Sequence, residues 1–216
     1  MAPELYQRVF KQLQEEKDLG LWEVSNSPWS APLTIAAKPE KAIRICSDYS
    51  EFNKVTKKDK YPIPRMEDIR LNIAGKRFIS LVDLTKGFNN LYIHPDSRDY
   101  LAVITPIGLI RPTRMPFGWA NGPGICQREV DLTLGSLNQV FRGYIDDISG
   151  GAENNQRLHD LLLLTVLYNF KIRGFRFHAA KAQLLADKIR LVGCYVDVTR
   201  GALTLVGEAL HNAATS

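Results

Sequence analysis

The spacing of apolar residues along this chain predicts three helices. A first helix should begin at Pro3, because proline is favoured in a first helical turn, and it should end near Gly20. Two more helices are expected in the second half of the chain, from Gly122 to about Leu134 and from about Glu153 to Ile172. Gly174 follows the last of these and is a typical residue at a helix C-terminus.

Short runs rich in β-branched residues, separated by turn residues, predict strands that pair as hairpins. Two strand segments are expected at Phe78–Asp83 and at Tyr144–Asp147. Three hairpins are also expected: residues 33–37 should pair with 42–47, residues 100–105 should pair with 109–113, and a third hairpin should lie within 188–198. Strands, helices and hairpins that alternate in this way indicate an α+β fold. We therefore expect an antiparallel split-βαβ sheet that is backed by helices.

Carboxylates stand where two of these strands end. Phe78–Asp83 is an apolar run that stops on Asp83, and Tyr144-Ile145 leads into Asp146-Asp147. Three aspartates brought together repel one another unless a cation lies between them, and an all-oxygen cluster suits Mg²⁺ or Mn²⁺. Two such ions can clamp the attacking and leaving oxygens of a phosphoryl displacement. The pattern favours a nucleotidyl transferase; the alternative is that Asp146-Asp147 only forms a hairpin turn.

Charge and length agree with a globular protein that binds a polyanion. The chain has 216 residues, 45% of them hydrophobic and 24% charged, enough for one large domain or two small ones. Its net charge is +5 and its pI is about 9.1. Six basic residues against one acidic residue lie between Lys171 and Arg190, and five against one lie between Lys54 and Arg65. These clusters could follow a phosphate backbone across a common cleft, or they could be solvated surface.

Cysteine usage and hydropathy exclude some classes of protein. Cys46, Cys126 and Cys194 are odd in number and lack metal-ligand spacing, which suggests a reducing compartment and no disulfide framework. The apolar run from Leu161 to Leu167 is too short to cross a bilayer, and the first residues do not form a signal peptide. We therefore expect an intracellular protein with no membrane partner.

Taken in order, the motifs of this chain resemble the reverse transcriptase domain of gypsy-type long-terminal-repeat retrotransposons, and more remotely the retroviral enzymes. The resemblance runs from Ser27 to about Val196. Each motif alone is weak, and their common order carries the resemblance. The motifs are Ser27–Pro32, Arg44–Tyr49, Asn53–Thr56, Tyr61–Pro64, Asp83–Phe88, Met115–Gly118 with Asn121 and Pro123, Tyr144–Asp147, and Leu191–Gly193.

The resemblance implies a right-hand polymerase, with fingers formed by residues 1–60 and 91–121 and a palm formed by 61–90 and 122–196. Residues 197–216 would be a tail or a partial thumb, so the thumb would be largely missing. The implied activity is RNA-directed DNA polymerisation with two Mg²⁺ (or Mn²⁺) ions. The implied partners are an RNA template, a DNA primer or RNA–DNA hybrid, and deoxynucleoside triphosphates. The implied location is a cytoplasmic particle or the nucleus.

The resemblance also assigns roles to individual residues. The metal ligands would be Asp83, Leu84, Asp146 and Asp147, and the three aspartates would be catalytic. The nucleotide site would comprise Lys38, Arg44, Lys86, Gly87, Phe88, Phe117, Gly118 and Lys181. The primer and template would contact Asn53, Tyr144 and Gly193.

Several of these roles have plain structural alternatives. The Phe88 ring would exclude a 2′-hydroxyl, or it would simply pack in the core. Lys181 would protonate the departing pyrophosphate, contact a backbone phosphate, or be an idle surface residue. Arg44 could be an ordinary surface charge on a strand, and Gly118 could serve only a turn.

Two other functions remain open at the level of sequence. The first is a non-catalytic nucleic-acid-binding remnant of a retrotransposon polyprotein, which would keep the fold and the basic clusters but have too little thumb to hold a primer–template. No ribonuclease H cluster, protease signature or integrase zinc site is found in the chain, so it would be the polymerase core of a larger polyprotein. The thumb, ribonuclease H and integrase segments would then be missing partners. The second is a viral RNA-directed RNA polymerase. Phe88 at the sugar position and Tyr144 before the aspartate pair disfavour that class.

Overall fold

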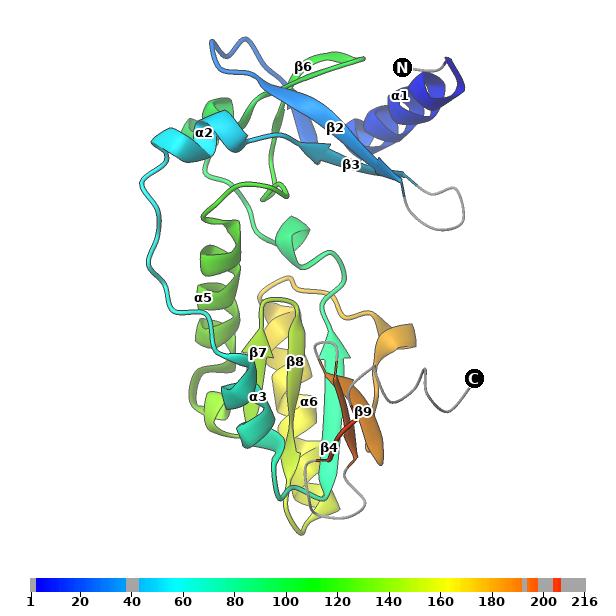
Figure 1. Ribbon diagram of the computed structural model, residues 1–216, viewed down its shortest axis with the longest axis vertical. Helices are drawn as coiled ribbons and strands as arrows, with labels where there is room; N and C mark the ends of the chain where they lie inside the picture. The colour runs from blue at the N-terminus through cyan, green and yellow to red at the C-terminus, as the bar shows by residue number, and fades with distance from the viewer. Residues whose placement is uncertain (1–2, 38–42, 192–193, 198–203, 207–216) are drawn as a thin grey trace. The chain divides into compact units, whose positions relative to one another are not determined.

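The computed structural model describes residues 3–37, 43–191, 194–197 and 204–206 (Figure 1). The chain divides into two units, each built from two separate segments. Unit 1 comprises residues 1–59 and 88–122, and unit 2 comprises residues 60–87 and 123–216. No helix in the described ranges is long and apolar enough to span a bilayer.

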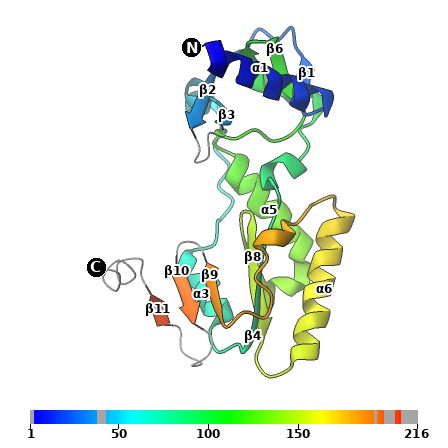
Figure 2. The same cartoon turned by 90° about the vertical axis from the view of Figure 1, so that its right-hand side faces the viewer.

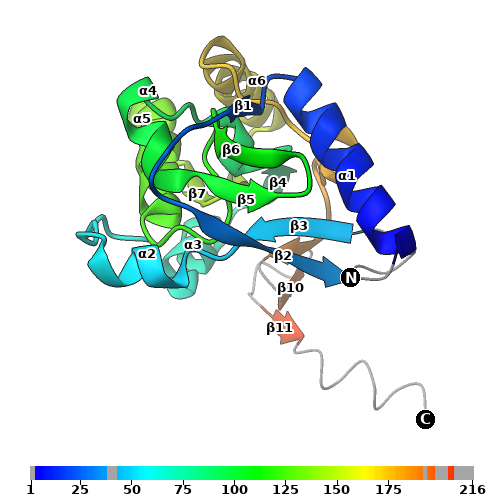
Figure 3. The same cartoon turned by 90° about the horizontal axis from the view of Figure 1, so that it is seen from above.

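Unit 1 is a five-stranded sheet with a helix packed on it. The strand order is β1-β6-β5-β2-β3, and Figure 3 shows α1 lying along this sheet. Val9 and Leu13 of α1 are fully buried with Ile110 of β6, which is why the apolar side of this helix faces inward. The elements are α1 (Pro3–Asp18), β1 (Trp22–Val24), β2 (Ala31–Ala37), β3 (Ile43–Ser47), α2 (Ser50–Val55), α4 (Pro95–Arg98), η3 (Asp99–Leu101), β5 (Val103–Thr105) and β6 (Gly108–Pro112).

The predicted hairpins of unit 1 are confirmed as β2–β3 and β5–β6. The strand expected from Tyr100 begins only at Val103, because residues 99–101 form a 3₁₀ turn. Asp99 holds this turn through hydrogen bonds from the Ser25 hydroxyl and the Arg111 guanidinium, each 2.9 Å long. The sequence did not predict the short strand β1, the parallel pairing of β2 with β5, or the short helices α2 and α4.

Unit 2 is centred on an antiparallel sheet of order β4-β8-β7, with a second sheet of order β11-β10-β9 beside it (Figures 1 and 2). The predicted antiparallel sheet backed by helices is therefore confirmed. The elements are α3 (Met66–Ile73), β4 (Phe78–Asp83), α5 (Gly122–Leu134), η4 (Gly135–Gln139), β7 (Phe141–Tyr144), β8 (Asp147–Ala152), α6 (Gln156–Ile172), η5 (Ala179–Lys181), β9 (Lys188–Leu191), β10 (Cys194–Asp197) and β11 (Thr204–Val206). The turn η2 (Gly87–Asn90) lies at the boundary of the two units.

Alternation along β4 assigns the two faces of the central sheet. Ile79 and Leu81 form one core cluster with residues of α3 and β9. Ser80, which points the opposite way, hydrogen-bonds to His159 of α6 at 3.0 Å. Asp83 follows Ile79 and Leu81 at a spacing of two, so it belongs to the α3 and β9 face rather than to the α6 face.

The two predicted helices of unit 2 are present, with one shifted start. α5 runs from Gly122 to Leu134 as expected. α6 begins at Gln156 rather than near Glu153, because Asn155 caps it by accepting a hydrogen bond from the Leu158 N–H at 3.1 Å. Gly174 has a φ of 84°, the left-handed conformation expected of a glycine that ends a helix.

Replacing Gly151 by Ala should destabilise unit 2 by about 3 kcal/mol, because a methyl group has no room at this position. A Cβ on Gly151 would overlap the backbone carbonyl of Phe78, its neighbour on β4. The free energy of unfolding can be measured with urea. Gly124→Ala is the matched control, since its Cβ would lie 3.6 Å from the Tyr61 Cβ, an ordinary contact. Equal stability of the two variants would contradict the close packing of β4 on β8.

Candidate active site

The pairing of β4 with β8 brings the carboxylates to one end of the sheet. Asp83 lies directly opposite Asp147 in the antiparallel register, so their side chains share a face. Asp146 occupies the turn between β7 and β8, where its carbonyl accepts a hydrogen bond from the Leu84 N–H at 2.8 Å. Asp83 and Asp147 thus lie on neighbouring strands at one end of the sheet, with Asp146 in the adjoining turn, and their joint role in binding metal stays a prediction.

Electrostatic interactions couple these carboxyl groups. Burial is the main reason that the pKa of Asp147 is raised to about 6, and the charges of Asp146 and Asp83 add to the rise. The pKa of Asp146 is also raised, first by burial and then by Asp83. Lys181 opposes both shifts, and its Nζ lies 3.5 Å from Asp83 Oδ2. The site therefore stabilises positive charge.

The donor chemistry fits a hard divalent cation. Half-buried carboxylates that raise each other's pKa gain from a cation placed between them, and an all-oxygen donor set suits Mg²⁺ or Mn²⁺. Within the described ranges, no three His, Cys, Asp or Glu side chains form a group already positioned to hold a metal ion. The assignment of Asp83, Leu84, Asp146 and Asp147 as metal ligands stays a prediction.

The backbone beside the carboxylates adopts unusual conformations. Ile145, which precedes Asp146, has a φ of 57°, and Lys86 has a φ of 48°. Left-handed conformations of non-glycine residues cost free energy and are found most often at functional sites. Gly87 is buried directly against Asp146, since a Cβ added there would lie 3.1 Å from the Asp146 Cβ. A side chain at position 87 would thus displace one of the carboxylates.

One residue that sequence reasoning missed holds the β7–β8 turn in place. Gln127 of α5 is fully buried, and its Nε2 donates to the Gly143 carbonyl at 3.0 Å. Its Oε1 accepts from the Ile145 N–H at 2.9 Å. The spacing along the helix could have indicated this role. Gln127 precedes the buried Val130 and Leu134 by three and seven residues, so its polar side chain lies on the apolar side of the helix.

A second group of predicted residues comes together in unit 1. The rings of Phe88 and Phe117 pack with centroids 5.0 Å apart, and Phe88 is half-buried against Gly122. Gly118 has a φ of 95°, and a Cβ there would lie 2.9 Å from the Ser47 carbonyl. Glycine is required at position 118 for both reasons.

Two asparagines fasten the loop that carries Phe117 and Gly118. Asn53, predicted to contact primer or template, donates to the Gly118 carbonyl and accepts from the Ala120 N–H, each at 2.8 Å. Asn121 donates to the Lys57 carbonyl and accepts from the Asp59 N–H, each at 3.0 Å. The Asn53 amide thus positions the loop, and its contact with nucleic acid stays a prediction.

The remaining predicted residues are described only in part. Tyr144 pairs with Asp147 on β8, and its side chain packs against the core cluster of Ile79 and Leu81. Arg44 lies in β3 opposite Ala36, and its side chain is outside the described part of the structure. Lys38 and Gly193 also lie outside the described residues.

Comparison with known proteins supports one family. The family described as reverse transcriptase (RNA-dependent DNA polymerase) matches residues 36–196, more than half of the chain. The Pol polyprotein of the Drosophila melanogaster transposon 297 is 34% identical over 146 residues, which are 65% of this chain and 14% of that polyprotein. The enzymatic polyprotein of cauliflower mosaic virus (strain Strasbourg) is 30% identical over 191 residues, 87% of this chain and 28% of that protein. The chain thus spans less than a third of either relative.

Solved structures share the fold. The foamy viral protease-reverse transcriptase in complex with double-stranded DNA superposes with a TM-score of 0.86 at 22% identity, over 97% of this chain and 36% of that one. The same enzyme in complex with an RNA/DNA hybrid gives a TM-score of 0.84 over 92% of this chain and 27% of that one. The predicted α+β fold of fingers and palm is confirmed.

Proposed function

Because this chain belongs to the reverse transcriptase family, we propose that it is the RNA-directed DNA polymerase core of a gypsy-type retrotransposon. It adds deoxynucleotides to the 3′ end of a primer on an RNA template, with unit 1 as fingers and unit 2 as palm. The observation that carries the proposal is Asp83 opposite Asp147, with Asp146 in the adjoining turn. The order of the motifs supports the gypsy type, and the similarity to the retrovirus-related Pol polyprotein of transposon 297 supports a transposon origin.

In this proposal the residues around the carboxylates have different roles in one nucleotidyl transfer. Asp83 and Asp146 hold two divalent ions, with Asp147 as an auxiliary ligand and Leu84 contributing its backbone carbonyl. Bound ions supply charge stabilisation for the attacking 3′-oxygen and the departing pyrophosphate. Gly87 lies against Asp146, so the backbone N–H groups of Lys86 and Gly87 can reach a triphosphate held there.

In this proposal three basic residues bind the phosphates of the nucleotide. Arg44 grips the incoming triphosphate, because a guanidinium fork binds phosphate oxygens in pairs, and Lys38 assists it. Lys181 is exposed and already lies beside Asp83, so it can approach the pyrophosphate as it leaves. The substrates are then an RNA template, a DNA primer and deoxynucleoside triphosphates.

Primer extension on poly(rA)/oligo(dT) with Mg²⁺ or Mn²⁺ tests the proposal. Incorporation of dTMP that requires the added metal supports it. Binding of the template–primer without incorporation would instead support the nucleic-acid-binding remnant. No binding and no incorporation by folded protein would contradict both functions.

Binding of an RNA–DNA hybrid should weaken steeply with salt, because contacts to phosphates release counterions. The basic residues between Lys54 and Arg65, and those between Lys171 and Arg190, are all exposed. The slope in question is that of the logarithm of the association constant against the logarithm of the salt concentration. Replacing Lys57 and Lys58 by Ala should flatten this slope by about one unit for each phosphate contact that is lost. Fluorescence anisotropy at several salt concentrations measures this slope.

The control for that experiment is the same change at two lysines of α1, the exposed Lys11 and the partly exposed Lys17. We expect the control to keep the slope of the parent protein. If Lys57→Ala with Lys58→Ala also keeps that slope, this cluster does not contact the phosphate backbone.

A further inference from the structure

The outer side of α6 carries an uncovered apolar stripe. The helix buries His159, Leu163, Val166 and Phe170 against the sheet. On its opposite side, five large apolar residues recur every three or four positions and remain 47% to 65% exposed. They are Leu158, Leu161, Leu164, Tyr168 and Ile172, and we call them the α6 stripe.

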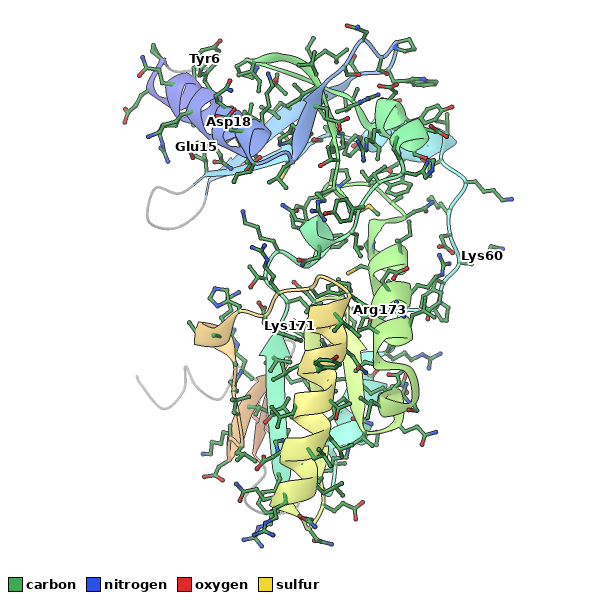
Figure 4. The ribbon with its side chains drawn as sticks, turned by 180° about the vertical axis from the view of Figure 1, so that it is seen from behind. Tyr6, Glu15, Asp18, Lys60, Lys171 and Arg173 are labelled. Atoms are coloured by element: carbon green, nitrogen blue, oxygen red, sulfur yellow. The ribbon has the colours of Figure 1, made fainter. Side chains whose placement is uncertain are left out.

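Nothing in the described part of unit 2 lies over this stripe. Figure 2 shows α6 at the side of the central sheet, and Figure 4, seen from behind, shows it nearest the viewer with its side chains uncovered. A helix that is apolar on both sides is normally buried on both, and a contiguous exposed apolar patch marks an interaction surface. The α6 stripe therefore requires an occupant.

We propose that the occupant is a second copy of this chain, with the two α6 helices packed antiparallel about a two-fold axis near Leu164 and Thr165. Such an interface must be self-complementary, so reversing the helix must reproduce the pattern of apolar residues. The α6 stripe meets this condition to within one residue. About an axis at Thr165, Leu158 falls opposite Ile172 of the second copy, and Leu161 lies one residue, about 1.5 Å along the helix, from the position opposite Tyr168 of the second copy.

The charges beside the stripe favour the same arrangement. Asp160 and Lys171 are eleven residues apart, about three helical turns, so they lie on the same flank of the stripe. In an antiparallel pair, matching flanks face each other, and Asp160 lies one residue from the position opposite Lys171 of the second copy on both sides of the axis. The hydrogen bond between Asp160 Oδ1 and His159 Nδ1, 2.8 Å long, fixes this carboxylate beside the stripe.

The first test is the oligomeric state of the full chain by sedimentation velocity over a range of protein concentrations. The parent protein should form dimers, and Leu161→Lys should raise the dissociation constant at least tenfold because it places two ammonium groups near the axis. The control is Leu132→Lys on α5, where the leucine is 56% exposed and lies outside the stripe. A parent protein that stays monomeric into the high micromolar range would overturn the proposal.

The second test fixes the direction of pairing by disulfide cross-linking. Position 165 lies near the axis, so the Thr165→Cys variant should give covalent dimers on mild oxidation. Their yield should exceed the background that the native cysteines give in the parent protein. Leu158→Cys alone should not, whereas an equimolar mixture of Leu158→Cys and Ile172→Cys should cross-link. Dimers of Leu158→Cys alone would indicate parallel helices and overturn the antiparallel arrangement. If Leu161→Lys and Leu132→Lys both lose the dimer while thermal melting shows both variants folded, the interface is not confined to the α6 stripe and the proposal is overturned.

Discussion

Replacing Asp146 by Asn should lower primer extension by a factor of about 10³ or more and leave the protein folded. The change removes a ligand charge and keeps the shape of the side chain, and metal charge stabilisation supplies several kcal/mol of the barrier reduction. The turn itself should persist, because the backbone carbonyl of Asp146, not its side chain, accepts the hydrogen bond from Leu84. Extension rates with saturating template–primer measure the effect, and thermal melting confirms the fold.

Asp187→Asn is the matched control, since it makes the same chemical change at an exposed residue of the same unit. It should retain the extension rate of the parent protein. If the Asp146→Asn and Asp187→Asn variants extend primers equally well, the carboxylates at the end of β4 and β8 are not catalytic.

Replacing Phe88 by Val should shift the preference for dTTP over UTP by about 10²-fold towards UTP. In the proposed function, the Phe88 ring lies where a 2′-hydroxyl would project, so ribonucleotides clash and deoxyribonucleotides do not. A smaller side chain removes that clash, and Val keeps an apolar side chain next to the ring of Phe117. Competition between the two nucleotides on one template measures the ratio.

The same truncation at Phe10, a half-exposed ring on α1, controls for general effects of losing an aromatic residue. If the Phe88→Val variant uses dTTP and UTP in the same ratio as the parent protein, Phe88 serves only to pack in the core. Equal use of both sugars by the parent protein would instead favour an RNA polymerase.

The parts of the site that could be predicted from sequence are those encoded by local patterns. Phe78–Asp83 is a β-branched run that stops on a carboxylate, and the strand ends there in the structure. The same reasoning placed Asp146 and Asp147 at the β7–β8 turn, and the antiparallel register then sets Asp147 opposite Asp83. The alternation of side chains along a strand is visible within six residues, so these strand ends could be predicted without knowing which segments pair with each other.

The parts that could not be predicted depend on side chains that meet across long stretches of chain. Asn53 and Asn121 bind backbone groups more than sixty residues away, and nothing near either residue indicates its partner. The parallel pairing of Ala31 with Val103 is equally distant. Asparagine in a polar segment is typical of any turn, so the sequence did not indicate the hydrogen bonds of Asn53 to the loop that carries Gly118, and the nucleic-acid contact that the resemblance implies for Asn53 stays a prediction.

The buried amide of Gln127 has a consequence for any experiment that randomises residues of α5. Its side chain must donate to one backbone group and accept from another two residues along. Glutamate can only accept, asparagine is one methylene shorter, and leucine does neither, so a saturation library at this codon should yield glutamine almost alone. The exposed Leu132, on the same helix, should tolerate most substitutions. Sequencing the variants of such a library that still fold would show which side chains at position 127 can hold the turn that carries Asp146. No kinetic measurement is needed.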